Sequence, residues 1–500
     1  MTITRFAPSP TGYLHIGGLR TALYSYLIAK QNNGKFLLRI EDTDRERFVA
    51  DGVLNILKSL YWAGIIPDEG VKLDCESIVG ECAATQEGDR GPYIQSERLE
   101  IYQKYADELI EKGFAYYCFC AQERLEELRK KQQENKQATG YDGHCREIDI
   151  KEAKNKIANG EKYVVRMKMP KNGVTIFQDL IRGEVSFKNE LVDDQIILKS
   201  DGFPTYHLAV VVDDHLMGIT HIIRGEEWLS SVPKHIQLYK YFGWEPPKFA
   251  HLPLLLNSDK SKLSKRQGDV SVSDYIKKGY LPEALINFVA FLGWNPGGEK
   301  ELFSLDEFAK EFSLEKVGKA GAVFNPQKLD WYNQQYIRRL APREFVARAL
   351  PFLADGKLFT EPKIENEEHE KRLEKILGLE RERITTLSEL PEMIRFAFEL
   401  PDYESELLVW KKSSAEEAKS ALSEVKEYLN KFSVQEWTKN NLEQKTGEWI
   451  KEKGYGNGVV LWPLRVSLSG QKDSPGPFEI MDALGKEESI IRLETAIAKF

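Results

Sequence analysis

Two short segments of this chain carry residue types that suit the handling of phosphate groups. The first is His15-Ile16-Gly17-Gly18, which follows an apolar run and a turn rich in proline and glycine. A stretch of good helix formers begins at this point. The free N–H groups and the positive dipole end of a helix N-terminus attract anions, and an imidazole adds a donor. The plainer alternative is an ordinary strand–turn–helix with a histidine at the surface.

The second segment is a basic loop, residues 260–268, which holds Lys260, Lys262, Lys265 and Arg266 among small residues. It follows a strand-like run. Lysines in such a loop can neutralise a departing pyrophosphate, a reaction in which positioning and charge provide most of the catalysis. The alternative is a basic surface loop that is only solvated.

The elements around these segments predict an α/β fold with a doubly wound parallel sheet. A helix over residues 15–31 lies between two apolar runs, and a second helix over 96–112 ends at Gly113. The predicted strands of this sheet are residues 3–7, 36–40, 195–199 and 219–223.

The two segments resemble the HIGH and KMSKS signatures of class I aminoacyl-tRNA synthetases, and their surroundings resemble glutamyl-tRNA synthetases. Gly18 stands where the first signature names a second histidine, and Leu263 and Arg266 replace the Met and the final Ser of the second. Both variants are familiar in the glutamyl branch. Matching segments are residues 5–12 (RFAPSPTG), 39–44 (RIEDTD), 204–208 (PTYHL), 212–218 (VDDHLMG), 223–228 (IRGEEW), 251–255 (HLPLL) and 282–285 (PEAL).

The resemblance implies a Rossmann-type catalytic domain with an inserted α+β domain that grips the acceptor end of tRNA. A stem-contact region and an all-helical anticodon-binding domain would follow. The insert is expected to hold short strands near residues 163–169 and 184–187, and the stem-contact region a helix over 282–292. The expected bounds are 1–114 and 194–256 for the two catalytic halves, 115–193 for the insert, 257–330 for the stem-contact region and 331–500 for the anticodon-binding domain.

The implied reaction needs no protein nucleophile. The carboxylate of L-glutamate attacks the α-phosphorus of ATP, pyrophosphate leaves, and the glutamyl group passes to the 3′-terminal ribose of tRNA-Glu. By resemblance, His15, Lys262 and Lys265 are the catalytic residues. A Mg²⁺ ion would be bound mainly by the phosphates. The ATP-binding residues would be His15, Gly17, Gly18, Glu227, Lys262 and Lys265.

A buried substrate carboxylate needs cations and donors, and arginine supplies both in a fork. The resemblance assigns Arg5 and Arg224 to this clamp. The alternative for Arg5 is a structural ion pair with Glu41 on a neighbouring strand. In the implied glutamate site, Tyr206 adds a hydroxyl, Glu41 accepts from the α-ammonium group, Ser9 supports it and Trp228 forms a wall.

The five cysteines do not suggest a disulfide framework. Cys118, Cys120 and Cys145 resemble the zinc site of some glutamyl-tRNA synthetases, in which a histidine two residues after the third cysteine completes the set. Here that position is Glu147, and the nearby histidine is His144, so either is a candidate fourth ligand for Zn²⁺. The alternative is three reduced cysteines packed among tyrosines.

The helical C-terminal part would read the anticodon, whose unstacked bases are recognised by stacking and edge hydrogen bonds. Arg383 falls where the family places a residue that senses the third anticodon base, and Arg381 lies two positions away. An arginine there is associated with rejecting tRNA-Gln. A plain surface arginine is the alternative.

The composition, with 42% hydrophobic and 30% charged residues among 500, is typical of a globular protein of several domains. We see no secretory signal and no run of about 18 apolar residues, so we expect no membrane and a cytoplasmic location. The net charge of −8 argues against a generic nucleic-acid coat but allows a local basic face for tRNA. The family default is a monomer. One candidate basic face is formed by Arg338, Arg339, Arg343 and Arg348.

Three rival functions are weighed against this interpretation. A glutaminyl-tRNA synthetase usually has a β-barrel anticodon domain, which the helical pattern after residue 330 opposes; a non-discriminating glutamyl enzyme stays open. A small glutamyl-queuosine synthetase lacks the anticodon domain. An inactive tRNA-binding relic or another nucleotidyltransferase is opposed by the joint presence of both signatures, Arg5 and Arg224.

Overall fold

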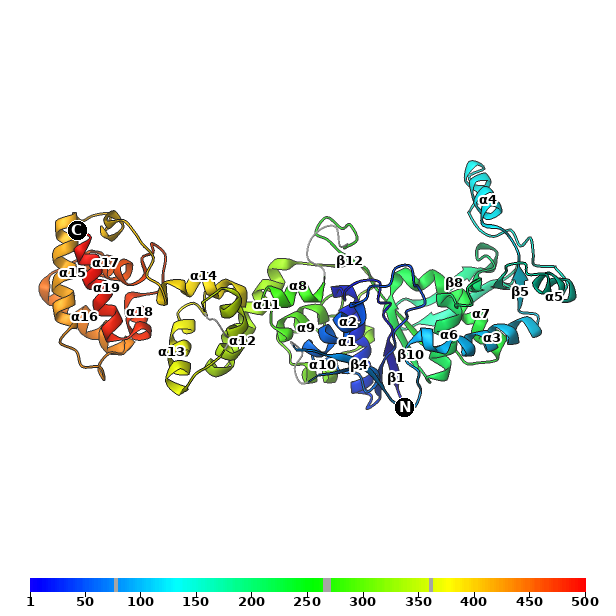
Figure 1. The fold of residues 1–500 in the computed structure, drawn as a ribbon, viewed down its shortest axis with the longest axis horizontal. Coiled ribbons are helices and arrows are strands. Elements are labelled where there is room, and N and C mark those ends of the chain that lie inside the picture. Colours follow the sequence, from blue (N-terminus) through cyan, green and yellow to red (C-terminus); the bar gives the residue numbers. More distant parts are fainter. Residues whose placement is uncertain (76–79, 264–270, 359–362) are drawn as a thin grey trace. The chain divides into compact units, whose positions relative to one another are not determined.

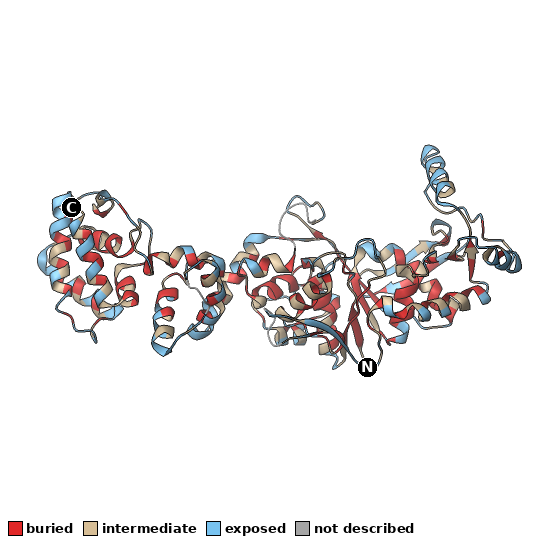
Figure 2. Ribbon diagram, in the orientation of Figure 1, coloured by how far each residue is buried: buried red, intermediate tan, exposed pale blue. Residues whose placement is uncertain are grey.

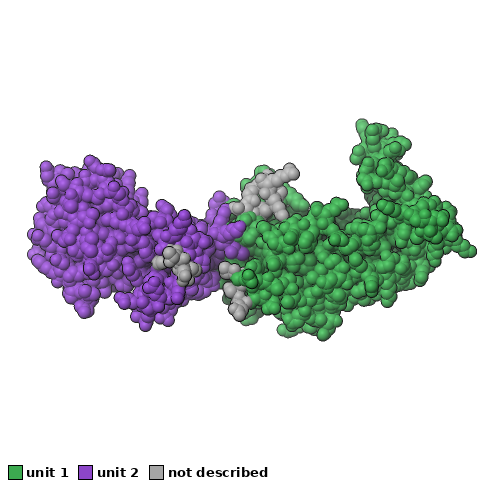
Figure 3. All heavy atoms as spheres, viewed as in Figure 1, with its two compact units in different colours: residues 1–275, 282–326 green, residues 276–281, 327–500 purple. Residues whose placement is uncertain are grey.

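The computed structural model describes residues 1–75, 80–263, 271–358 and 363–500 (Figure 1). The chain divides into two compact units, which Figure 3 shows in different colours. Unit 1 comprises residues 1–275 and 282–326, and unit 2 comprises residues 276–281 and 327–500. The basic-loop residues Ser264, Lys265 and Arg266 lie outside the described part.

Unit 1 is built on an eight-stranded sheet with the order β4-β3-β2-β1-β10-β11-β7-β8. Neighbours from β3 to β7 in this order are parallel, and the outer pairs β3–β4 and β7–β8 are antiparallel. The predicted α/β fold is thus confirmed. The strands are β1 Ile3–Phe6, β2 Lys35–Leu38, β3 Glu69–Asp74, β4 Ala83–Glu87, β7 Val174–Asp179, β8 Gly183–Lys188, β10 His221–Gly225 and β11 Lys248–Leu252.

The central strand β1 lies between β2 and β10, so the winding of the sheet reverses there. In open parallel sheets, the crevice beyond the carboxyl ends of the strands at such a reversal binds ligands. All four residues of β1 are buried, as expected for a strand covered on both faces. Figure 2 shows buried residues in this sheet and on the helices of both units.

Helix α1 Ile16–Gln31 links β1 to β2 and packs against β1. Its inner face is apolar, with Leu19, Leu23 and Leu27 fully buried, and it ends before Asn32-Asn33-Gly34 as predicted. The other helices associated with this sheet and its insert are α2 Gly52–Trp62, α3 Leu99–Glu111, α4 Gln122–Glu134, α5 Ile150–Ala158, α6 Tyr206–Leu216 and α7 Val232–Phe242.

A separate antiparallel sheet of three strands has the order β5-β6-β9. Its strands are β5 Ala115–Cys118, β6 Val164–Met167 and β9 Ile196–Leu198. The prediction that 195–199 joins the parallel sheet is therefore wrong, because β9 pairs antiparallel with β6. The strand expected at 184–187 inside the insert belongs to β8, whose partner β7 pairs with β11 of the large sheet. A short apolar run does not encode its partner, which distant contacts decide.

The remaining elements of unit 1 precede or follow the basic loop in the chain. The short strand β12 Leu255–Leu256 precedes the loop and pairs with β13 Ala322–Val323. Helix α9 Pro282–Ala290 confirms the helix expected there, and α10 Leu305–Glu311 follows. Helix α8 Val272–Lys277 begins just after the loop.

The described part of unit 2 after residue 327 is helical and contains no strand, which confirms the predicted helical C-terminal domain. Its helices are α11 Pro326–Arg339, α12 Pro342–Asp355, α13 Glu367–Gly378, α14 Leu390–Ile394, α15 Ala415–Leu429, α16 Lys439–Lys453, α17 Asn457–Ser469, α18 Pro477–Leu484 and α19 Lys486–Ala498.

Among the described residues, none of the helices combines the length and the apolar character needed to traverse a bilayer.

Candidate active site

His15 is the N-cap of α1, and its Nδ1 accepts a hydrogen bond from the N–H of Gly18 over 3.1 Å. When the ring is neutral, its proton therefore resides on Nε2. A Cβ at Gly17 would lie 3.0 Å from Cε1 of His15, and a Cβ at Gly18 would lie 2.9 Å from a methyl carbon of Leu14. Gly17 thus lets the imidazole lie against the first turn of the helix, where an anion would bind, and Gly18 leaves room for the side chain of Leu14.

Both described ends of the basic loop are anchored by main-chain contacts. Before the loop, the N–H of Leu263 donates to Leu255 over 2.9 Å, and the exposed Lys262 bridges to β12. After the loop, Ser271 bridges to His15, and Val272 donates to the carbonyl of Leu14 over 2.8 Å. The chain therefore returns from the lysine-rich loop directly to the residue that caps α1, although the two signatures lie far apart in sequence.

Arg224, at the carboxyl end of β10, is only 5% exposed. Its Nε donates to Nε2 of His251 over 3.1 Å and its Nη1 to the hydroxyl of Tyr206 over 2.7 Å. Nη2 donates to the carbonyl of Trp228 over 3.4 Å, and the guanidinium lies 5.9 Å above the ring of Phe249. These partners are all uncharged, and no carboxylate among the described residues forms an ion pair with Arg224.

A buried charge is costly unless an opposite charge compensates it. The guanidinium of Arg224 is oriented by its neutral acceptors, but they do not cancel its charge. An anion bound beside the guanidinium would supply the missing compensation. The geometry is therefore that of a carboxylate- or phosphate-binding position.

Arg5, on the neighbouring strand β1, has a charged partner. Its Nε lies 3.1 Å from Oδ1 of Asp214, which also accepts from Arg39 over 2.8 Å. Burial raises the pKa of Asp214, but Arg5 and Arg39 outweigh this effect and hold it below its ordinary value. The carboxylate of Glu41 pairs with Arg39 over 2.9 Å. The suggested ion pair between Arg5 and Glu41 is thus replaced by two other pairs.

Glu41 is 8% exposed, and burial raises its pKa above the ordinary value, although Arg39 and Arg5 oppose the rise. A cation bound beside Glu41 would favour the ionised form further.

The sequence analysis assigned no role to the buried residues that form ion pairs beside this site, including Arg39, Asp213 and Asp214. Asp213 accepts from Arg98 over 2.8 Å and from the hydroxyl of Tyr102 over 2.8 Å. A signal was present, because two adjacent aspartates directly follow the apolar run 208–212 in a helix. Carboxylates in such a position are buried and need cationic partners.

The rings of Trp228 and Tyr206 are tilted against each other with centroids 4.4 Å apart, and Trp228 is exposed. Glu227 is exposed, and its carboxylate folds back so closely on Gly225 that a Cβ there would collide with it. Ser9 is exposed in the turn after β1. Ser9 follows the carboxyl end of β1 in the chain, and Glu227 and Trp228 follow that of β10.

Comparison with known proteins decides the family. The family model described as "tRNA synthetases class I (E and Q), catalytic domain" matches residues 1–331, and "Anticodon binding domain" matches residues 344–497. The glutamate–tRNA ligase of Finegoldia magna is 46% identical, covering 99% of this chain and 98% of the relative. That of Clostridium acetobutylicum is 47% identical, with 99% and 98% covered. The chain belongs to the glutamate–tRNA ligase family.

The fold agrees with solved structures of this family. The crystal structure of a glutamate tRNA ligase from Elizabethkingia meningosepticum, in complex with its amino acid, superposes with a TM-score of 0.86 at 37% identity and 99% coverage of both chains. The glutamate-tRNA synthetase of Elizabethkingia anophelis gives 0.83 at 36% identity, again with 99% of each chain covered. The family predicted from the two signatures and their surrounding segments is thus confirmed.

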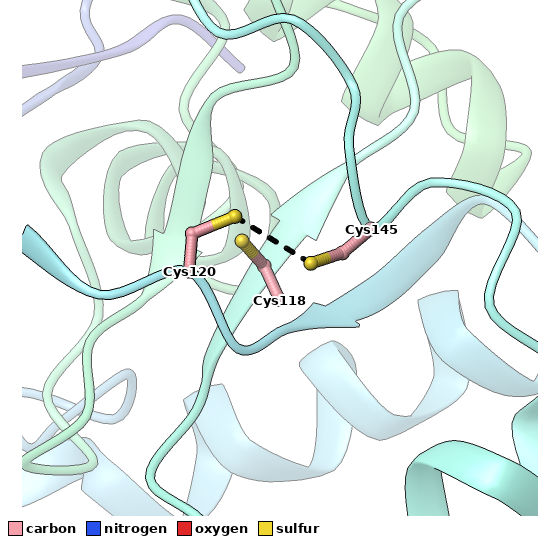
Figure 4. A group of neighbouring side chains, drawn as sticks. All are labelled: Cys118, Cys120 and Cys145. Carbon is pink, nitrogen blue, oxygen red and sulfur yellow. Dashed lines mark hydrogen bonds between the residues drawn. The ribbon is translucent and has the colours of Figure 1, made fainter. Parts of the chain in front are cut away.

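In this glutamate–tRNA ligase family member, Cys118, Cys120 and Cys145 come together at the end of β5 (Figure 4). All three sulfur atoms lie within 4.8 Å of one another, and the Sγ atoms of Cys120 and Cys145 are 3.6 Å apart. A hydrogen bond from Cys145 lowers the pKa of Cys118 to about 4, although burial opposes the shift. Sulfurs on a tetrahedral zinc ion, with Zn–S of about 2.3 Å, lie at similar separations, so the three residues fit a zinc site.

Neither candidate fourth ligand lies in this cluster. His144 and Glu147 are exposed, and the carboxylate of Glu147 is 3.8 Å from Nε of Arg146. Instead, the hydroxyl of Tyr141 lies 3.4 Å from Sγ of Cys118 and 3.6 Å from Sγ of Cys120.

In unit 2, the two arginines proposed for the anticodon have different environments. Arg381 donates to the carbonyls of Ile337 and Arg338 over 3.2 and 2.7 Å, and so caps the C-terminus of α11. Arg383 has a partly exposed side chain held 2.9 Å from Glu380. Burial raises the pKa of Glu380 to about 7, although Arg383 opposes the shift. Arg381 thus has a structural task, whereas Arg383 is accessible.

Unit 2 also contains a pocket of about 230 Å³ beside α17. The rings of Trp410 and Trp462 form one side, with centroids 5.2 Å apart, and Arg465 lies 4.8 Å above the ring of Trp462. The pocket is lined by Trp410, Asn457, Gly458, Leu461, Trp462, Arg465, Gly476 and Pro477.

Proposed function

We propose that this chain ligates L-glutamate to tRNA-Glu in two steps. Glutamate and ATP would form glutamyl-adenylate and pyrophosphate, and the glutamyl group would then pass to the 3′-terminal ribose of the tRNA. The observation that carries the proposal is the buried, oriented and uncompensated guanidinium of Arg224, next to Arg5 at the switch point of the sheet.

In this proposal the γ-carboxylate of glutamate binds to Arg224 and Arg5, and Tyr206 contributes a hydroxyl. Tyr206 accepts from Arg224, so its own proton remains available for the ligand. Glutamine would present a neutral amide and leave the charge of Arg224 buried without compensation. Glu41 would bind the α-ammonium group with Ser9 nearby, and Trp228 would close the side of the pocket.

The nucleotide half would lie over the N-terminus of α1. His15 and the amides of Gly17 and Gly18 would bind phosphates of ATP, as the capping geometry supports. Lys262 and Lys265 would neutralise the leaving pyrophosphate, and a Mg²⁺ ion held mainly by the phosphates would offset more of their charge. Glu227, on the rim, would face the nucleotide.

We further propose that Cys118, Cys120 and Cys145 bind one zinc ion. The hydroxyl of Tyr141 is better placed to complete the set than His144 or Glu147. The zinc would be structural and tie the end of β5 to the loop that carries Cys145, within the insert expected at residues 115–193.

The helical residues 331–500 would read the anticodon. An unstacked base would stack on Trp410 or Trp462, with Arg465 adding a donor and a positive charge. Arg383 would contact the third anticodon base. We expect the protein to act as a cytoplasmic monomer.

Aminoacylation with labelled glutamate, ATP and either purified tRNA-Glu or purified tRNA-Gln tests the function. Charging of tRNA-Glu alone would support a discriminating enzyme and a role for Arg383. Charging of both tRNAs would keep the active-site assignments but refute discrimination. Charging of neither would refute the proposed function. Pyrophosphate exchange with and without tRNA would show whether activation needs the tRNA.

A further inference from the structure

A line of buried polar side chains lies behind Arg224 and belongs to none of the roles assigned above. His251 accepts from Nε of Arg224, and its own Nδ1 lies 2.6 Å from Oδ2 of Asp179. On the other side, Nδ1 of His235 is 3.5 Å from Nη2 of Arg224, and Nε2 of His235 is 3.2 Å from Nδ1 of His207. His235, His251 and Asp179 are each at most 3% exposed.

The direction of each hydrogen bond in this line can be worked out. The Nε–H of Arg224 is always a donor, so Nε2 of His251 must carry a lone pair. The ring proton is then on Nδ1 and is donated to Asp179. Burial also lowers the pKa of His251, and the charge of Arg224 adds to this effect, so the ring is neutral although Asp179 opposes the shift. Asp179 therefore selects one tautomer of His251.

The carboxylate of Asp179 is itself held in one orientation. Its Oδ1 accepts from the main-chain N–H groups of Ile181 and Arg182 over 3.0 and 2.9 Å, with that of His251 at 3.3 Å. Its Oδ2 is thereby left to face His251. The N–H groups of Ile181 and Arg182 belong to the turn between β7 and β8, and that of His251 belongs to β11, so the carboxylate connects this turn to the neighbouring strand.

A neutral support has a specific consequence for Arg224. Around Arg5, the guanidinium groups of Arg5 and Arg39 are matched by the carboxylates of Asp214 and Glu41. If Asp179 touched Arg224 directly, it would cancel that charge in the same way. The imidazole between Asp179 and Arg224 orients the guanidinium through a hydrogen bond, but it keeps the negative charge of Asp179 one residue further away.

We infer that His251 and Asp179 are positioning residues for Arg224: Asp179 fixes the tautomer in which His251 accepts from the guanidinium, which keeps Arg224 oriented and uncompensated for a substrate carboxylate. The inference rests on the proposed glutamate site. It assigns part of the preference for glutamate over glutamine to two residues that touch no substrate.

The substitution Asp179→Asn tests the inference because it preserves shape. Three N–H groups converge on Oδ1, so the amide oxygen of the asparagine will occupy that position. The amide NH₂ will then face Nδ1 of His251 and donate to it. The ring proton will move to Nε2 and point at the Nε–H of Arg224, where two donors cannot bond.

We expect Asp179→Asn to raise the KM for glutamate at least tenfold in pyrophosphate exchange with tRNA present. The KM for ATP should stay within about twofold, and kcat should fall by less than the KM rises. Discrimination against glutamine, measured as the ratio of kcat/KM values, should fall by a similar factor. A variant that merely perturbed folding would alter both substrates together.

Nitrogen NMR of the histidine-labelled protein provides the direct readout. The His251 signals, assigned by their loss in His251→Gln, should report a neutral Nδ1–H tautomer in the unsubstituted protein and an Nε2–H tautomer in Asp179→Asn. A raised KM without a change of tautomer, or a changed tautomer with an unchanged KM, would overturn the inference.

A second pair of variants applies if Asp179→Asn does not fold. His251→Gln places an amide oxygen near the position of Nε2 and should keep the KM for glutamate within about threefold. His251→Leu removes the acceptor and should raise it at least tenfold. Equal KM values for the two would refute the role of His251. If the unsubstituted protein itself fails to activate glutamate, the proposed function fails instead.

Discussion

Replacement of Arg224 by methionine separates a binding role from a structural one. In the free protein, Arg224 is buried with only neutral acceptors, so its removal also removes an uncompensated charge. Loss of the hydrogen bonds destabilises the folded state, whereas removal of the buried charge stabilises it, so the two effects on the folding free energy oppose each other. We therefore expect Arg224→Met to change the melting temperature little.

The effect on substrate should be large. Two charge-assisted hydrogen bonds to a carboxylate, at about 1.5–3 kcal/mol each, amount to about 3–6 kcal/mol. At about 1.4 kcal/mol per factor of ten, kcat/KM for glutamate should fall about 10²- to 10⁴-fold. The assay is pyrophosphate exchange at varied glutamate with tRNA-Glu and saturating ATP.

Arg98→Met is the matched control. Arg98 is 2% exposed, but its Nε bonds Asp213 over 2.8 Å, so the substitution leaves a buried carboxylate with fewer partners. We expect it to destabilise the fold by about 3–5 kcal/mol while the KM for glutamate stays near that of the unsubstituted protein. If Arg224→Met retained glutamate activation, or if it unfolded as readily as Arg98→Met, the reasoning would be refuted.

Four further outcomes are expected. Lys265→Ala should lower kcat far more than it raises the KM for glutamate in steady-state aminoacylation, and an unchanged kcat would remove Lys265 from the mechanism. The purified protein should contain about one zinc per chain by elemental analysis, and Cys145→Ser should lose most of it; equal zinc contents would contradict the site. Trp462→Ala should raise the KM for tRNA-Glu about 5- to 100-fold, since one stacked base contributes about 1–3 kcal/mol, with no change in the KM for ATP. Finally, the pKa of Glu380 is about 7 against an ordinary 4.5, so its contribution to stability is lost as the pH rises between these values. As the pH rises from 4.5 to 7, the unsubstituted protein should therefore lose melting temperature relative to Glu380→Gln. Parallel pH curves of the two proteins would show that Glu380 does not titrate in this range.

Local patterns in the sequence predicted much of this fold correctly. The helix that begins after His15 and ends before Asn32-Asn33-Gly34 was predicted closely, because capping, helix propensity and turn residues act within a few positions. The helical C-terminal part follows from the same short-range periodicity. The two signatures together with the segments around them were sufficient to predict the family, which the comparisons confirm.

These local patterns did not predict which strands pair with one another. The short apolar run in β9 is compatible with the parallel sheet and with the small antiparallel sheet. Only its pairing with β6 shows that it belongs to the small sheet. The pairing of β7 with β11 likewise joins Asp179 to Phe249, residues far apart in the chain. Hydrophobicity specifies that such strands are buried but not which edge they join.

The sequence by itself therefore determined the family, the α/β character of the first unit and the helical character of the C-terminal part. It named Arg5, Glu41 and Arg224 as site candidates but assigned no role to Arg39, Asp213 or Asp214. Only the tertiary structure decided the partners of these charges: Arg5 with Asp214 instead of Glu41, Arg224 with His251, and Tyr141 beside the cysteines. The physical reason is range. Helix caps and periodicities depend on neighbours in the chain, whereas the effective charge of a buried arginine depends on acceptors that arrive from distant strands.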